Sequence, residues 1–129
     1  MLPESIFSAG IGDLFVIRIA GNTTDNIAIG SIEYALSHLN APLVVVLGHT
    51  CCGAVNAAIC GGAEGHIKSI TDKIKLAIGD ENNDYAACKL NVNSEVRAIS
   101  KSLSQENIFA KVMGAIYHID TGIVEFIED

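Results

Sequence analysis

The sequence lacks several features that would place it in common functional classes. It has no run of about 18 apolar residues long enough to cross a membrane, and no basic leader followed by a small-residue cleavage site. Basic residues are few, eight against fifteen acidic ones, and form no cluster that would neutralise phosphates. Its glycines match neither the Lys-bearing phosphate loop nor the dinucleotide fingerprint. We therefore expect a cytoplasmic protein that binds neither membranes nor nucleic acid.

What is present indicates one globular domain. The chain has 129 residues, of which 50% are hydrophobic, and it shows no internal repeat, low-complexity tract or linker. We interpret residues 1–129 as a single domain. The sequence contains four cysteines, two of them adjacent, and in a chain without secretion signals we expect these to be reduced thiols or metal ligands. They are Cys51, Cys52, Cys60 and Cys88.

Hydrophobic periodicity predicts strands that alternate with helices. The run Leu43–Leu47 is continuously apolar, as is typical of a parallel strand covered on both faces. The pattern indicates an α/β fold with a mostly parallel sheet flanked by helices. The predicted strands are 14–20, 43–47, 112–119 and 123–127, and the predicted helices are 27–39, 54–60, 67–77 and 85–103.

The candidate site is the segment Gly48–Gly53, which follows a predicted strand. Ligands of open α/β sheets bind beyond the carboxyl ends of the strands. His49 and Cys52 are three residues apart, and with a helix starting between them we expect both side chains to face the same way. Imidazole and thiolate are both good zinc ligands. The spacing alone fits equally well a histidine satisfied by backbone beside a small buried cysteine.

Longer stretches of the chain resemble the β-class carbonic anhydrases in order and spacing. They are GDLFVIRIAGN at 12–22, GSIEYAL at 30–36, PLVVVLGHTCCGAVNAA at 42–58 and the closing strands from Gly114 to Phe126. The resemblance implies that His49 and Cys52 are the second and third protein ligands of a zinc ion. By the same resemblance, the water bound to this zinc ion would attack carbon dioxide to give bicarbonate. It also implies a homodimer or larger assembly, because this family builds its sites at a dimer interface.

The chain departs from the family's pattern at one place. Before the dipeptide that corresponds to Pro3-Glu4, the family carries a buried strand ending in Cys-x-Asp-Ser-Arg, which supplies the first zinc ligand and a catalytic Asp/Arg pair. Residues 1–129 do not contain this motif, so we expect no catalytic dyad in them and a site missing one ligand. Three explanations stay open: a start codon placed at an internal methionine, a deliberately shortened chain, or a natural fragment.

No other residue is well placed to complete the zinc site. On a helix, Cys51 would point about 100° away from Cys52, and Cys60 would lie about 12 Å along it. Cys88 falls on an apolar stripe, and we have no reason to place His38, His66 or His118 near the metal. We therefore expect weak or absent zinc binding by this chain alone.

Loss of the family's strand would also leave a gap in the sheet, between the segments 14–20 and 42–47. We expect either that these two strands pair directly or that a partner chain covers the gap.

A second interpretation is a non-catalytic module of the same fold. The turn that includes Gly48 and Gly53 offers backbone N–H groups at a helix N-terminus, which could hold bicarbonate, phosphate or sulfate without a metal. This chain would then serve in anion binding or assembly rather than in carbon dioxide hydration.

Overall fold

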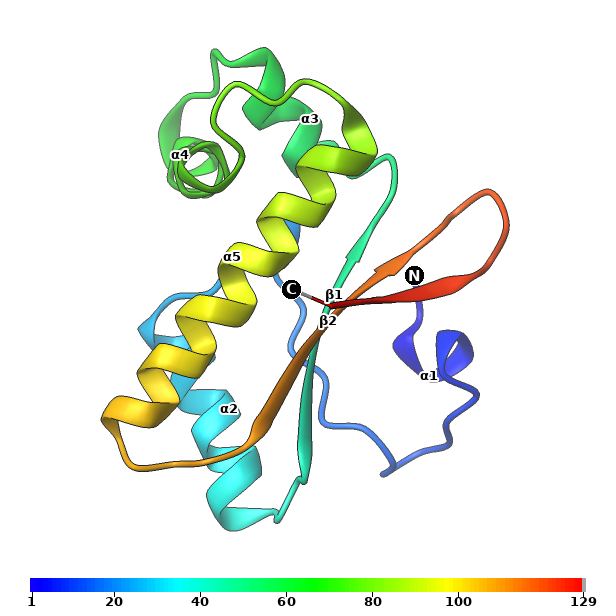
Figure 1. Cartoon of the computed structure of the whole chain (residues 1–129), viewed down its shortest axis with the longest axis vertical. Helices are drawn as coiled ribbons and strands as arrows, with labels where there is room; N and C mark the ends of the chain where they lie inside the picture. The colour runs from blue at the N-terminus through cyan, green and yellow to red at the C-terminus, as the bar shows by residue number, and fades with distance from the viewer. Residues whose placement is uncertain (129) are drawn as a thin grey trace.

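The structure is a computed structural model that describes residues 1–128, and Figure 1 shows its arrangement. The elements in chain order are α1 (Pro3–Ile6), η1 (Ala20–Asn22), α2 (Asn26–His38), β1 (Leu43–His49), α3 (Gly53–Cys60), α4 (Gly65–Ile78), α5 (Asp84–Gln105), β2 (Lys111–Tyr117) and β3 (Val124–Ile127). Within the described part, no helix is long and apolar enough to span a bilayer.

The three strands form one mixed sheet in the order β1-β2-β3. β1 and β2 run parallel, in a register that pairs Leu43 with Lys111 and His49 with Tyr117. β2 and β3 run antiparallel and form the predicted closing hairpin. This confirms the α/β fold class. Over residues 1–128, one side of β1 has no strand beside it.

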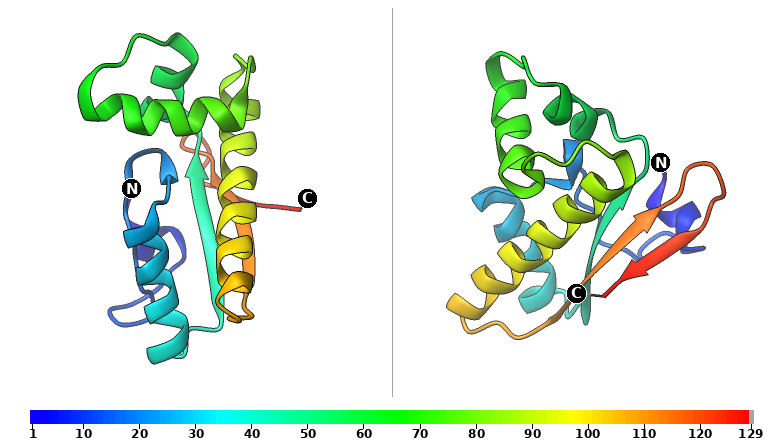
Figure 2. Two further views of the ribbon diagram at one scale, coloured as in Figure 1. Left: turned by 90° about the vertical axis from the view of Figure 1, so that its left-hand side faces the viewer. Right: turned by 45° about the horizontal axis from the view of Figure 1, so that its top comes forward.

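Helix α5 packs against β1 and β2 and provides much of the core. Its first turn is capped by Asn83, whose side chain accepts a hydrogen bond from the Ala86 N–H, and Cys88, Val92 and Leu103 of its apolar stripe are buried. A β-carbon at Gly48 or Gly114 would lie 2.5 or 2.7 Å from a methyl of Val92, so these glycines let α5 approach the sheet closely. Figure 2 shows β1 lying between α2 and α5.

Most of the predicted elements are confirmed. The strand at 43–47, the closing hairpin and the four predicted helices all form, with bounds within a few residues of those expected. Asp25 accepts a hydrogen bond from the Ala28 N–H and so starts α2, and Gly61 and Gly79, both with positive φ, end α3 and α4.

The predicted strand at 14–20 is wrong. Residues 14–19 form no regular element, and the apolar side chains among them are 37% to 49% exposed. A strand needs a neighbour to take up its backbone hydrogen bonds, and none lies beside this run in the described chain. The segment 14–20 does not pair directly with β1 either. Direct pairing of these two segments, one of the two outcomes expected for the gap, is therefore also wrong.

The end of this segment is nevertheless firmly anchored to the helices. Asn91 Nδ2 donates to the Gly21 carbonyl over 2.8 Å, and Thr24 Oγ1 donates to Glu95 over 2.6 Å. Lys73 lies 3.2 Å from the buried Glu95 carboxylate and also donates to the Thr24 carbonyl. The run 14–19 is therefore fixed in position at its C-terminal end, although its side chains are half-exposed.

Candidate functional site

The predicted site lies where β1 ends and turns into α3. Thr50 N–H donates to the Tyr117 carbonyl over 3.1 Å, and the Thr50 hydroxyl accepts from the Ile119 N–H over 3.0 Å. The next amide, that of Cys51, donates to the Asp84 carboxylate over 2.9 Å. The turn is therefore held by the β2–β3 connection on one side and by the start of α5 on the other.

The turn, and not a helix face, presents His49 and Cys52. α3 begins at Gly53 with Cys52 as its N-cap, and Cys51 has a φ of 56°. The expectation that a helix starts between the two residues is wrong, as is the assumption of helical geometry at Cys51. The structure still brings the pair together, since both side chains line the same cavity.

The ring of His49 is oriented by its neighbour. Its Nδ1 lies 2.8 Å from the Thr50 carbonyl oxygen, which can only accept. The hydrogen bond therefore requires a proton on Nδ1 and leaves the Nε2 lone pair of the neutral ring unused. Zinc-binding histidines are commonly fixed in this way, with one nitrogen bonded to a carbonyl and the other facing the metal.

Cys88 lies beside the turn but is a buried thiol. Its Sγ donates to the His49 carbonyl over 3.2 Å. Burial, with the nearby Asp84 charge as a second cause, raises the pKa of the Cys88 thiol to about 12. The thiol is therefore neutral at ordinary pH. Within residues 1–128, no group of three or more His, Cys, Asp or Glu side chains is placed to hold a metal ion.

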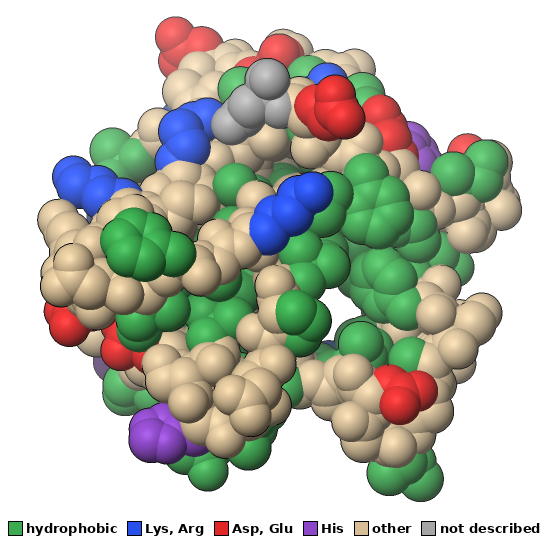
Figure 3. All heavy atoms as spheres, turned by 60° about the horizontal axis from the view of Figure 1, so that its bottom comes forward, with side chains coloured by type: hydrophobic (Ala, Val, Ile, Leu, Met, Phe, Trp, Pro, Cys, Tyr) green, Lys and Arg blue, Asp and Glu red, His purple; other side chains and the backbone are tan. Residues whose placement is uncertain are grey.

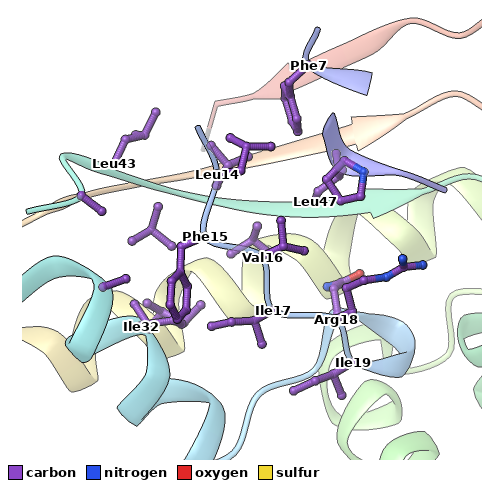
Figure 4. A pocket seen from close by; sticks show the side chains of 18 of the residues that line it. Phe7, Leu14, Phe15, Val16, Ile17, Arg18, Ile19, Ile32, Leu43 and Leu47 are labelled. Carbon is purple, nitrogen blue, oxygen red and sulfur yellow. The ribbon is translucent and has the colours of Figure 1, made fainter. Parts of the chain in front are cut away.

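The cavity that His49 and Cys52 line is large and mostly apolar. Its volume is about 1320 Å³, and it lies between the segment 12–24, β1 and α2. Among the described residues that line the cavity, the side chains of the Asp, Glu, Lys and Arg types are those of Asp13 and Arg18. Figure 3 shows the opening surrounded largely by hydrophobic side chains, and Figure 4 shows the run from Leu14 to Ile19 passing beside β1.

The two predicted anion-binding glycines lie at opposite ends of the turn. Gly48 lies in β1 against Val92, which gives it a packing role regardless of any ligand. Gly53 is the first residue of α3, and a β-carbon there would meet no atom within 4 Å. Their anion-binding role stays a prediction.

Sequence reasoning missed Asn22 and Asp84. Asn22 lines the cavity, and its Nδ2 is buried without a hydrogen-bond partner. Asp84 reaches back across 33 residues to the Cys51 amide, and its other oxygen is buried and unpaired. The resemblance included Asn22 only as the end of a matching string. No local pattern distinguishes Asp84 from other acidic residues at a helix start.

A second polar cluster lies beyond the turn. Glu125 accepts hydrogen bonds from the Tyr85 hydroxyl, at 2.8 and 2.9 Å, and lies 2.9 Å from His118 Nε2. The hydrogen bond with His118, followed by that with Tyr85, lowers the pKa of Glu125, and the bond to Glu125 raises the pKa of Tyr85. His118 is thus engaged with Glu125 and not with the cavity.

Comparison with known proteins gives a consistent result. A family model described as carbonic anhydrase matches residues 1–124. Carbonic anhydrase 2 of Mycobacterium tuberculosis is 46% identical over 80 residues, which cover 58% of this chain and 39% of the relative. A carbonic anhydrase of Mycolicibacterium smegmatis is 52% identical over 66 residues, which cover 51% of this chain and 32% of the relative. The matches therefore span about a third of the length of these relatives.

Solved structures share the fold at low sequence identity. A β-carbonic anhydrase of Coccomyxa superposes with a TM-score of 0.85 at 22% identity, covering 98% of this chain and 66% of the other. A β-carbonic anhydrase of Sordaria macrospora, described as tetrameric, superposes with a TM-score of 0.81 at 21% identity. The match covers 99% of this chain and 75% of the other. In both cases nearly all of this chain is matched, and the other chain has further segments.

Proposed function

The chain belongs to the β-class carbonic anhydrase family, and from this premise we propose that it carries part of a zinc site for the reversible hydration of carbon dioxide to bicarbonate. His49 and Cys52 are two of the protein ligands. The observation that carries the proposal is that these two side chains line one cavity while Thr50 holds the Nδ1 of His49, so that Nε2 is free to bind a metal.

The donor set fits zinc, which prefers imidazole and thiolate ligands. A bound zinc ion would supply the Lewis acid that activates water for attack on carbon dioxide. This chain's own residues orient the His49 ring, place Cys52 at the start of α3 and surround the site with apolar walls. Carbon dioxide is itself apolar, and such walls suit it.

We propose that residues 1–129 by themselves bind zinc weakly and turn over carbon dioxide slowly or not at all. Catalytic zinc sites have three protein ligands and an open position for water. His49 and Cys52 supply two, and the described residues hold no cluster that adds a third. The remaining donor would then come from polypeptide outside residues 1–129 or from another chain.

The expected assembly is a homodimer or a larger oligomer. Several large apolar side chains of the N-terminal part, including Leu2 and Ile11, are exposed, as an interface would require. The Sordaria macrospora relative is described as tetrameric, which supports the same expectation. Light scattering coupled to gel filtration would measure the mass in solution.

The alternative of a non-catalytic anion-binding module is not favoured. The family match and the pairing of an imidazole with a thiolate at one cavity both point to metal chemistry. The N-terminus of α3 by itself does not distinguish an anion site from an ordinary helix start.

Cobalt(II) titration tests the site, because a cysteine ligand gives a thiolate-to-cobalt absorption band. We expect the band in the wild-type chain at high cobalt concentration, its loss in Cys52→Ala, and its retention in Cys60→Ala, since Cys60 is exposed at the end of α3. A band that persists in Cys52→Ala would contradict the assignment. So would its absence from the wild type at millimolar cobalt.

A further inference from the structure

The start of α5 contacts the turn between His49 and Cys52 at two points. Asp84 and Cys88 are four residues apart on this helix and therefore share one face. Asp84 Oδ2 accepts a hydrogen bond from the Cys51 N–H over 2.9 Å. Cys88 Sγ donates to the His49 carbonyl over 3.2 Å. Figure 1 shows this end of α5 beside the connection from β1 to α3, so one helix face holds the backbone of the turn.

Cys51 adopts a backbone conformation that a side chain disfavours. Its φ is 56°, in the left-handed region that residues other than glycine seldom occupy. A change of Cys51 to a negative φ would rotate the next peptide and redirect Cys52, which caps α3 and is 5% exposed. The distance between the imidazole of His49 and the thiol of Cys52 therefore depends on the conformation of Cys51.

The hydrogen bond to Asp84 supports this conformation of Cys51. An ionised acceptor makes a hydrogen bond about twice as strong as one between neutral groups. Asp84 lies in the first turn of α5, where the helix dipole stabilises a negative charge. The helix itself is firmly packed, since Ala87 and Val92 are fully buried. Asp84 is therefore a rigidly held acceptor, 33 residues from the amide that it binds.

The surroundings of Asp84 do not suit a purely stabilising role. Its second oxygen, Oδ1, is buried and has no hydrogen-bond partner among the described residues. A buried carboxylate oxygen without a donor is unfavourable for folding. The oxygen that does have a partner binds the Cys51 amide, which lies between the two proposed metal ligands.

We propose that Asp84 is a positioning residue for the metal: it holds Cys51 in the left-handed conformation and so sets the distance between His49 Nε2 and Cys52 Sγ. The inference rests on the proposed function, because this distance matters for binding only if both atoms take the same ion. It extends that function by making metal affinity depend on a side chain of α5.

Cobalt(II) titration of three variants tests the proposal, with the thiolate-to-cobalt band as the signal. Asp84→Ala removes the acceptor, and we expect cobalt to bind at least tenfold more weakly. Asp84→Asn keeps an acceptor oxygen without the charge, and its affinity should stay within about threefold of the wild type. Glu81→Ala is the matched control and should leave the affinity unchanged, since Glu81 accepts from the Asn82 and Asn83 amides at the same end of α5.

A measurement on the metal-free chain separates positioning from loss of stability. Cys52 is buried and Cys51 is exposed, so the rate of alkylation of Cys52 by iodoacetamide reports on the turn. Mass spectrometry at low conversion measures this rate for each cysteine, under conditions where circular dichroism shows folded protein. We expect Asp84→Ala to raise the rate at Cys52 at least tenfold. Asp84→Asn and Glu81→Ala should leave it close to that of the wild type.

Asp84→Leu guards against a failure of the alanine variant to fold. Leucine has nearly the volume of aspartate plus a methyl group and lacks both oxygens, so it fills the site without an acceptor. It should show the same losses as Asp84→Ala and takes its place if that variant is unfolded. Unfolding of both variants would assign Asp84 a role in folding and overturn the proposal.

Three other results would overturn the proposal. They are wild-type cobalt affinity in Asp84→Ala, an equal loss of affinity in Asp84→Asn, and an alkylation rate of Cys52 that does not rise in Asp84→Ala. Any of these, with a cobalt band in the wild type that requires Cys52, would leave the zinc site standing. Absence of the band from the wild type would instead refute the zinc site, and the alkylation rates would still show whether Asp84 holds the turn.

Discussion

His49 Nδ1 and the Thr50 carbonyl oxygen lie 2.8 Å apart, within one turn that is itself bonded to β2 and α5. The contact joins two adjacent residues, yet its geometry depends on groups 33 to 69 residues away, because Tyr117, Ile119 and Asp84 hold the turn. The orientation of a proposed zinc ligand is therefore set by the tertiary fold.

Thr50→Val tests this dependence. The substitution keeps the side-chain shape but removes the hydroxyl oxygen that accepts from the Ile119 N–H. We expect cobalt affinity to fall about tenfold, as for other residues that support metal ligands. Thr121→Val, which removes a similar acceptor within the β2–β3 turn, is the matched control and should leave cobalt affinity unchanged. Equal losses of cobalt affinity in the two variants would show that the Thr50 hydroxyl does not specifically support the orientation of His49.

Gly48→Ala tests the packing beneath the site. Its β-carbon would lie 2.5 Å from Val92 Cγ2, so either α5 or β1 must move. We expect the free energy of unfolding to fall by about 1–3 kcal/mol, the range for overpacked cores. Gly53→Ala, where the new methyl meets nothing within 4 Å, should change it by less than about 0.5 kcal/mol. Urea denaturation measures both, and similar losses would contradict the packing role of Gly48.

Lys73→Met tests the anchor of the segment 14–24. It leaves the Glu95 carboxylate, whose side chain is 3% exposed, without its cation. Breaking a buried pair costs about 3–5 kcal/mol, and because Lys73 itself is 39% exposed we expect about 2 kcal/mol. Lys68→Met breaks the surface pair with Asp72 and should cost less than about 1 kcal/mol. A loss no larger for Lys73→Met than for Lys68→Met would show that the anchor is not stabilising.

The raised pKa of the buried Cys88 thiol predicts that the free energy of unfolding falls at alkaline pH. Its folded-state pKa of about 12 lies above that of an exposed thiol, so between pH 9 and 12 the folded state keeps a proton that the unfolded state has released. Stability from this group is complete below pH 9 and falls above it, by about 1 kcal/mol per pH unit. Cys88→Ala should flatten the decline measured by urea denaturation between pH 8 and 10. An unchanged slope would contradict the burial of this thiol as the cause.

The sequence predicts elements whose signals are local. The apolar run of β1 and the helical periodicities of α2 to α5 are properties of short windows, and the structure confirms them. His49 and Cys52 could be recognised for the same reason, since one turn carries both and the surrounding string resembles a known family.

The errors have a common physical origin. The run 14–20 has strand composition, but a strand also requires a neighbouring strand, which no window of sequence contains. A helix start between His49 and Cys52 is the wrong prediction, because Cys51 adopts a positive φ and the chain turns before the helix begins at Gly53. Asp84, Asn91 and Glu95 act across 33 to 71 residues, so their roles become visible only in the folded chain.

Zinc stoichiometry of the purified 129-residue chain, measured by elemental analysis after dialysis and combined with X-ray absorption at the zinc edge, tests the central claim most directly. The account predicts well under one zinc per chain, with any bound ion showing one sulfur and one imidazole donor from His49 and Cys52. One tightly held zinc per chain, with a third protein donor from residues 1–129, would contradict it.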